Sequence, residues 1–184
     1  MDTRDDHPRL RIDRPRIRAA HEGRLAEWPR ERRPLTVRAE VEVVENQRKT
    51  ARVGPFVIES DEGTIVGGDA TAPTPLSLFI SAVGFAILTD LVRAFAVHDL
   101  EVDDLRLEIE ADFPLGAKYG DEPIGVEASE VRYTVDVRSG AARAAVEAAI
   151  EWAERYCHAV HSLRQPVAVT GRYRVDGEPL ITTG

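Results

Sequence analysis

Polar and apolar side chains alternate over the stretch that begins at Leu35. Val37, Ala39, Val41 and Val43 occupy every second position, and charged or hydroxyl residues fill the positions between them. A period of two predicts a strand with one apolar face. Two further short runs, 48–53 and 56–60, are separated from it and from each other by turn residues such as Gly54-Pro55. The pattern predicts a small antiparallel meander.

A long apolar stretch follows, and it predicts a helix over about 75–98. Thr74 is a suitable N-cap and Pro75 suits the first helical position. Between 76 and 88 the only polar side chains are Ser77 and Ser81. A helix without a polar face must be covered on all sides, and a chain of 184 residues seldom has enough other helices to do so. We therefore expect a core shared between two subunits.

The second half of the chain repeats the change from strand to helix. Alternation predicts strands over 101–112 and 126–137, with a loop over 114–123 between them. A helix is predicted from Ser139 to about Leu163, and closing strands over 166–175 and 180–182. The apolar stripe of this helix recurs at steps of three and four residues and consists of Val146, Ala149, Ile150, Ala153, Cys157 and Val160. The order of elements predicts an α+β fold.

Charge divides the chain into two regions. Residues 1–33 carry ten Arg against seven Asp or Glu, which gives +3 and leaves −11 for the remainder of the total of −8. We predict an Arg- and Pro-rich arm or extension over 1–34, loosely docked or flexible, and one domain over 35–184. Within the arm, Leu10, Ile12 and Ile17 suggest a short edge strand, and Ala19–Trp28 a short helix.

The overall acidity argues against nucleic acid or an anionic membrane surface as a partner. The first residues lack the apolar segment of an export signal, and the 76–88 run is shorter than a membrane span. The chain has one cysteine, Cys157, so no disulfide can form within it. These features predict a cytoplasmic protein.

Two separated motifs resemble those of the OsmC/Ohr family, the osmotically inducible protein C and organic hydroperoxide resistance proteins. The first is Gly67-Gly68 followed by Pro73-Thr74-Pro75-Leu76 at the start of the apolar helix. The second runs from Ala153 to Leu163 around Cys157 and is followed by Gln165-Pro166-Val167. The resemblance spans roughly 36–182. It implies an OsmC-like intertwined homodimer, with mostly antiparallel sheets around two long central helices per subunit.

Active members of that family are thiol peroxidases. A reactive cysteine in the first helix attacks a hydroperoxide and becomes a sulfenic acid, and a second cysteine condenses with it to a disulfide. An Arg and a Glu favour the thiolate, which is the nucleophile. In this chain the family's Arg could correspond to Arg48 or to Arg52.

The reactive cysteine of the family has no counterpart in this chain. Spacing from the Pro-Thr-Pro turn puts Ala86 at that position, with Phe85 as the alternative one residue away. The family's Glu corresponds to Ser77. Cys157 matches the resolving cysteine and has no partner. The resemblance therefore implies a divergent member without the two-cysteine pair.

Asp90 and His161 are the remaining candidates for chemistry. Asp90 lies one turn beyond Ala86 on the same helix face. A carboxylate against an apolar wall could serve as a general acid or base, but it could instead lie at the surface or pair with Arg93. His161 lies four residues after Cys157, a spacing that suits a metal or a thiol–imidazole pair, yet no further ligand completes a metal site. We predict no metal and no cofactor.

Three functional hypotheses remain. The first is a divergent OsmC-like protein that has lost peroxidase activity and binds or transforms a small hydrophobic molecule in a pocket between subunits. Its site would combine Cys157 and Asp90 with the pocket residues Ser77, Ser81, Phe85, Ala86 and His161. The second is a one-cysteine hydroperoxide reductase that uses Cys157. The third is a structural or regulatory dimer without catalysis.

Overall fold

The structure is a computed structural model that describes residues 10–28, 34–114, 116 and 125–184. The predicted loop over 114–123 lies almost entirely outside these residues. Helix α2 (Pro75–Val97) is the longest element, and the other helices and strand β4 pack on it. The described elements form an α+β fold, as the pattern of the sequence predicts.

Helix α2 begins where its capping residues predict. The Thr74 hydroxyl accepts a hydrogen bond from the Ser77 backbone N–H (3.2 Å), and Pro75 follows at the first helical position. The helix ends at Val97 with His98 as its C-cap, and Asp99 then adopts a left-handed conformation with φ of 56°. Among the described residues α2 alone is long and apolar enough to cross a membrane, a property it shares with core helices of soluble proteins.

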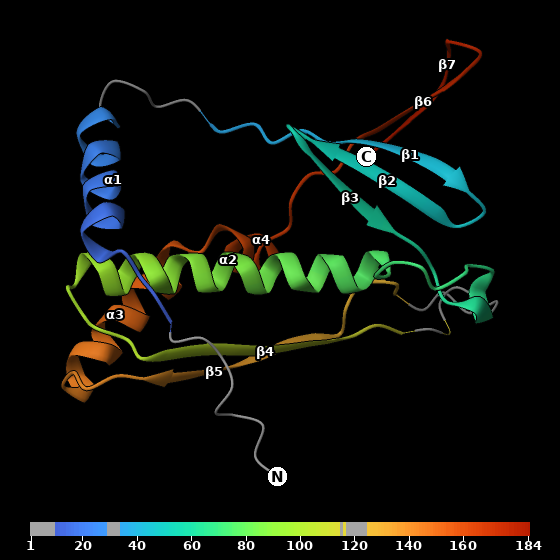
Figure 1. Ribbon diagram of the computed structural model, residues 1–184. Helices are drawn as coiled ribbons and strands as arrows, with labels where there is room; N and C mark the ends of the chain where they lie inside the picture. The colour runs from blue at the N-terminus through green and yellow to red at the C-terminus, as the bar shows by residue number, and fades with distance from the viewer. Residues whose placement is uncertain (1–9, 29–33, 115, 117–124) are drawn as a thin grey trace.

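One face of α2 packs on strand β4 (Asp104–Asp112), which pairs with β5 (Glu130–Arg138) in an antiparallel sheet. Figure 1 shows the helix lying along these two strands. Gly84 permits the close approach, because a Cβ there would lie 3.2 Å from the Leu107 side chain. The predicted strands over 101–112 and 126–137 are confirmed with shorter bounds.

The second predicted helix is divided in two. Helix α3 (Arg143–Tyr156) and helix α4 (His158–Arg164) are separated by Cys157, whose φ of −72° and ψ of 104° are extended rather than helical. The prediction of one continuous helix over 139–163 is therefore wrong. The core brings both helices together with α2, and its buried members are Val83, Ile87, Leu91, Ala94, Phe95, Val102, Ala149, Ala153, Cys157 and Val160.

The arm contains a longer helix than predicted. Helix α1 (Arg14–Glu27) begins directly after Asp13, whose carboxylate accepts from the Arg16 backbone N–H (3.1 Å). Ile17 is thus helical, and the predicted edge strand is wrong. The cause is local, because Asp13 is an N-cap and Pro15 lies in the first helical turn.

The meander is present as β1 (Glu40–Glu45), β2 (Arg48–Val53) and β3 (Phe56–Ser60). The first strand begins at Glu40 rather than Leu35. Figure 1 shows this sheet apart from the helices, above the N-terminal half of α2 in this view. It packs closely on none of the described helices, and its apolar side chains are largely exposed.

The chain closes with a hairpin, β6 (Gly171–Val175) and β7 (Glu178–Thr183), also shown apart from the core in Figure 1. The predicted strand over 166–175 is therefore confirmed only in its second half.

Asp61 organises the turn between β3 and α2. Its buried carboxylate accepts from the backbone N–H groups of Glu62, Asp69 and Thr71 and from the Thr71 hydroxyl. These donors, the Thr71 N–H first, lower the pKa of Asp61 to about 2. Gly68 is required here, since a Cβ at this position would lie 2.0 Å from the Glu62 carbonyl oxygen.

Candidate functional site

Cys157 lies at the junction of α3 and α4, and only 2% of it is exposed. Burial raises the pKa of the Cys157 thiol, because the charged thiolate loses its hydration. The backbone N–H of Val160 opposes this effect, and the Asp90 carboxylate adds to the rise through its charge and a hydrogen bond. The two predicted catalytic residues, Asp90 and Cys157, therefore lie close together, and the charge of Asp90 favours the neutral thiol over the thiolate.

Asp90 is 6% exposed and pairs with Arg93 one turn further along α2. The Arg93 Nη1 lies 3.0 Å from the Asp90 Oδ1, and the Arg93 side chain is 40% exposed. A buried carboxylate requires such a partner. Pairing with Arg93 is one of the alternatives that the sequence offered for Asp90. The Asp90 carboxylate is therefore not exposed.

The predicted pocket residues of α2 lie mostly on its outer face. Ser77, Ser81 and Phe85 are exposed, Phe85 to 69%, while Ala86 is half-buried against the core. The Ser81 hydroxyl donates to the Ser77 carbonyl oxygen (2.8 Å), so its polarity is satisfied within the helix. In the single chain this face is open.

His161 is exposed on α4, and its backbone N–H donates to the Cys157 carbonyl oxygen (3.0 Å). No group of three or more His, Cys, Asp or Glu residues within the described part of the chain is arranged to hold a metal ion.

Arg48 and Arg52 lie on β2, away from Cys157. The register of the sheet places them on the side opposite Ala51 and Val53, which belong to its apolar face. The structure thus gives neither arginine a contact with the buried thiol.

A cavity of about 660 Å³ lies between the first half of α2, the C-terminal end of β4, the start of β5, and α4. None of the predicted pocket residues lines it. Its lining is mainly apolar and aromatic, with a few polar groups at the edge: Leu76, Phe79, Val83, Phe113, Glu127, Ala128, Ser129, Glu130, Val131, Tyr133, Val160, Leu163 and Arg164.

Two residues that line this cavity, Tyr133 and Arg164, both contact Glu154. The Tyr133 hydroxyl donates to the Glu154 carboxylate, which also lies 3.7 Å from Arg164. Burial and then this hydrogen bond raise the pKa of Tyr133 to about 12. The sequence pattern does not single out these three residues. Tyr133 lies within a predicted strand, and no pattern links residues that meet through tertiary contacts.

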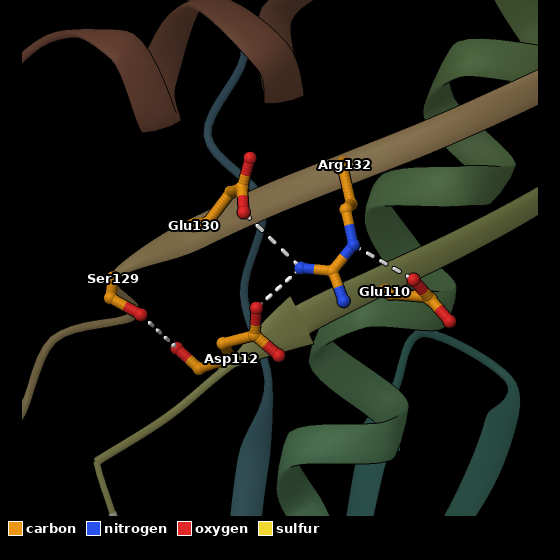
Figure 2. Close-up of polar contacts among 5 residues, drawn as sticks. All are labelled: Glu110, Asp112, Ser129, Glu130 and Arg132. Carbon is orange, nitrogen blue, oxygen red and sulfur yellow. Dashed lines mark hydrogen bonds and ion pairs between the residues drawn. The ribbon is translucent and has the colours of Figure 1, made fainter.

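An arginine network lies where β4 ends and β5 begins. Figure 2 shows Arg132 between Glu110, Asp112 and Glu130, with its Nε 2.9 Å from Glu110. Hydrogen bonding to Asp112 and the surrounding negative charge raise the pKa of Arg132. The Ser129 hydroxyl donates to the Asp112 carbonyl oxygen (3.2 Å). These contacts fix the start of β5, where Ser129 and Glu130 line the cavity.

A second, shallower hollow of about 490 Å³ lies on the outer face of α2. Phe85 is one of its walls and is thus the only predicted pocket residue that borders a hollow described for this chain. The other walls are Ile17 of α1 and Leu88, Thr89, Val92 and Arg93 of α2.

Comparison with known proteins gives a consistent result. A sequence-family model described as OsmC-like protein matches residues 67–171, more than half of the chain. The structure is similar to the crystal structure of an OsmC-like protein from Mycoplasma pneumoniae, with 14% identity, a TM-score of 0.61, and coverage of 72% of this chain and 89% of that one.

It is also similar to an organic hydroperoxide resistance protein OsmC from Legionella pneumophila, with 17% identity, a TM-score of 0.54, and coverage of 72% and 91%. At these identities the likeness concerns the fold. No curated protein matches the sequence.

Proposed function

The chain belongs to the OsmC-like protein family, and we propose that it is a divergent, cytoplasmic member that binds a small hydrophobic molecule and has lost two-cysteine peroxidase chemistry. The supporting observation is the state of its single thiol. Cys157 is buried and its pKa is raised, whereas a peroxidase needs an accessible cysteine with a lowered pKa. Ala86 occupies the position that the family resemblance gives to the reactive cysteine.

The family fold and the exposed apolar surfaces support a homodimer. One face of the β1–β3 sheet carries Val41, Val43, Ala51, Val53, Phe56 and Ile58, and no described element covers it. The outer face of α2, with Phe85, is open as well. Contiguous apolar surface of this extent marks an interaction site. We propose that the sheet of one subunit covers the α2 face of the other.

The two hollows beside α2 support the binding role. The larger has an apolar body and a few polar groups at one edge, a composition typical of sites for small molecules. Catalysis on the bound molecule is not part of this proposal, because the two predicted catalytic residues, Asp90 and Cys157, are buried and do not line the cavity.

A peroxidase assay tests the loss of redox chemistry. Wild type and Cys157→Ser should consume an organic hydroperoxide with a dithiol reductant at the same background rate. Turnover by wild type that Cys157→Ser abolishes would instead establish the one-cysteine reductase. Native mass spectrometry of the purified protein should show a co-purifying small molecule. Its absence under several expression conditions would count against the binding role.

Ala82→Asp tests the dimer. Ala82 is exposed in the single chain, so the substitution should leave the subunit fold possible but place a charge within the proposed interface. Sedimentation should show a dimer for wild type and loss of soluble dimer for the variant. Ala148→Asp, the same substitution at an exposed position of α3, is the control for the change of charge. A stable wild-type monomer at micromolar concentration would contradict the dimer.

A further inference from the structure

Strands β3 and β6 each lie at an open edge of their sheet. Strand β3 is the last strand of the meander, and β6 is paired on one side only, with β7. Large apolar side chains are exposed on both, among them Phe56 and Ile58 of β3 and Tyr173 and Val175 of β6. Such an edge presents unpaired backbone N–H and C=O groups. Each edge can therefore accept a further strand of matching pattern.

A two-residue turn, Gly54-Pro55, fixes the direction of the backbone groups of β3. It is flanked by the register pair Val53–Phe56. The pair beside such a turn exchanges its hydrogen bonds within the hairpin, and the direction then alternates along the strand. The backbone groups of Val57 and Glu59 therefore point to the open edge of β3.

The same rule applies to β6. Its turn to β7, Asp176-Gly177, has positive φ at both residues (52° and 86°) and follows directly after Val175. Arg174 and Arg172 therefore direct their backbone groups to the open edge of β6. The outer edge of β7 suits a partner less well, since Pro179 has no N–H group to donate and the register of the hairpin shifts beside it.

The two edges match when they are placed antiparallel. Placing Glu59 opposite Arg172 sets opposite charges against each other on the polar face of the meander. The same register brings the apolar residues of the two strands together in two pairs: Ile58 with Tyr173, and Phe56 with Val175. These pairs fall on the apolar face. Within the described part of the chain, neither Glu59 nor Arg172 takes part in an ion pair.

The other edge of the meander, β1, does not match β6. The alternation along β2 directs the backbone groups of Thr50 toward β1, and its register partner Glu42 points back toward β2. Val41 therefore faces the open edge, and its side chain belongs to the apolar face. An antiparallel β6 at this edge would place Arg172 on that face, so β3 is the edge that fits.

The packing of the chain indicates a second copy as the partner. Strands β3 and β6 do not pair within the chain. The hairpin follows α4, which packs on α2, so it starts beside the helix that we expect the partner's sheet to cover. The β3 edge of the partner and this hairpin then meet over the same helix, and both turn their apolar faces toward it.

We propose that β6 of one subunit pairs antiparallel with β3 of its partner, in the register that sets Glu59 opposite the partner's Arg172. The inference rests on the proposed homodimer and specifies its contacts: each sheet of the dimer combines strands of both subunits. A twofold axis repeats the pairing, so the dimer contains it twice. Strand β3 and all but the first residue of β6 lie outside residues 67–171, the part that matches the OsmC-like family.

Disulfide formation between introduced cysteines tests the register in the full-length protein. Ile58 and the partner's Tyr173 would form a pair without mutual hydrogen bonds, in which the Cα atoms are about 4.5 Å apart and within reach of a disulfide. Ile58→Cys/Tyr173→Cys in a Cys157→Ala background should oxidise to a covalent dimer on a non-reducing gel. The control Val57→Cys/Tyr173→Cys puts the thiols on opposite faces and should cross-link about tenfold less.

Charge reversal tests the proposed ion pair. Glu59 and Glu42 are matched sites, because both lie opposite Thr50, on the two sides of β2. Glu59→Arg and Arg172→Glu should each raise the dimer dissociation constant about tenfold in sedimentation equilibrium, since a like-charge pair would occur twice. The double variant should return to within about threefold of wild type. Glu42→Arg, at the other edge, should change the constant less than about threefold.

The outcomes separate the strand pairing from the dimer. A wild-type dimer whose Ile58→Cys/Tyr173→Cys variant does not cross-link overturns the pairing and leaves the homodimer in place. An internal disulfide in a monomer band shows that β6 pairs with β3 of its own chain and overturns the pairing between subunits. Equal effects of Glu59→Arg and Glu42→Arg, or no recovery in the double variant, overturn the register. A wild-type monomer overturns pairing and homodimer together, and the co-purified molecule still tests the binding role separately.

Discussion

The Asp90–Arg93 pair should respond unequally to removal of its two members. The Asp90 side chain is 9% exposed and that of Arg93 is 40% exposed, with 3.0 Å between the paired atoms. Arg93→Ala leaves a buried carboxylate without its cation. Asp90→Asn leaves an amide that still accepts from Arg93, and the guanidinium can turn toward water.

The magnitudes follow from these environments. Removing one partner of a fully buried ion pair costs about 3–5 kcal/mol. Because Arg93 is more than a third exposed, solvent already weakens the pair, and we expect about 2–3 kcal/mol for Arg93→Ala. Asp90→Asn loses the ion pair but also removes the cost of burying a charged carboxylate. We therefore expect the free energy of unfolding to change by about 0–1 kcal/mol.

Urea denaturation at a fixed protein concentration measures both values, provided that the slope of the transition is unchanged. The fixed concentration is required because the stability of the proposed dimer would depend on it. Arg93→Leu serves as a control that restores the apolar stem of the side chain. Equal losses for Arg93→Ala and Asp90→Asn, or a larger loss for Asp90→Asn, would refute the reasoning.

Three further results are expected. The pKa of Asp61 is lowered from 3.8 to about 2, so its ionised carboxylate stabilises the fold at pH values above 3.8, and this contribution is lost as the pH falls toward 2. Asp61→Asn should therefore reduce the thermal midpoint at pH 7. It should also flatten the acid side of a plot of the midpoint against pH. The raised pKa of Tyr133 favours the neutral phenol, so the contribution of Tyr133 to folding stability is full below pH 10 and is lost between about pH 10 and 12. Tyr133→Phe should remove a step near pH 12 from the absorbance titration. An unchanged titration would contradict the assignment. Iodoacetamide at pH 7.5 should label Cys157 about a hundredfold more slowly in native protein than in urea, since the thiol is buried and its pKa is raised. Fast labelling of the native protein would argue for a reactive cysteine.

Local patterns in the sequence predicted most of the elements. Alternation located the strands of the meander and the β4–β5 pair, and the Thr74-Pro75 step located the start of α2, because these signals arise from neighbours in the chain. The start of α1 carried a local signal as well. Asp13 and Pro15 mark a helix beginning at Arg14, but scattered apolar residues suggested a strand there instead.

The tertiary structure alone decided the environment of the candidate site. Cys157 interrupts a continuous helical pattern that contains no Gly or Pro at that point, and it does so where Cys157 and Val160 both enter the core beside α2. The sequence suggested Arg93 as one possible partner of Asp90, and only packing shows that the carboxylate is buried and therefore requires it.

The cavities depend on contacts that no local pattern encodes. Tyr133, Glu154 and Arg164 come from three elements and meet only in the folded chain, as Ile17 of α1 meets Phe85 of α2. The sequence by itself determined most of the α+β elements, their order and the all-apolar helix, because backbone propensity and periodic burial act over a few residues. It could not determine which side chains line a hollow, since that depends on how distant elements pack.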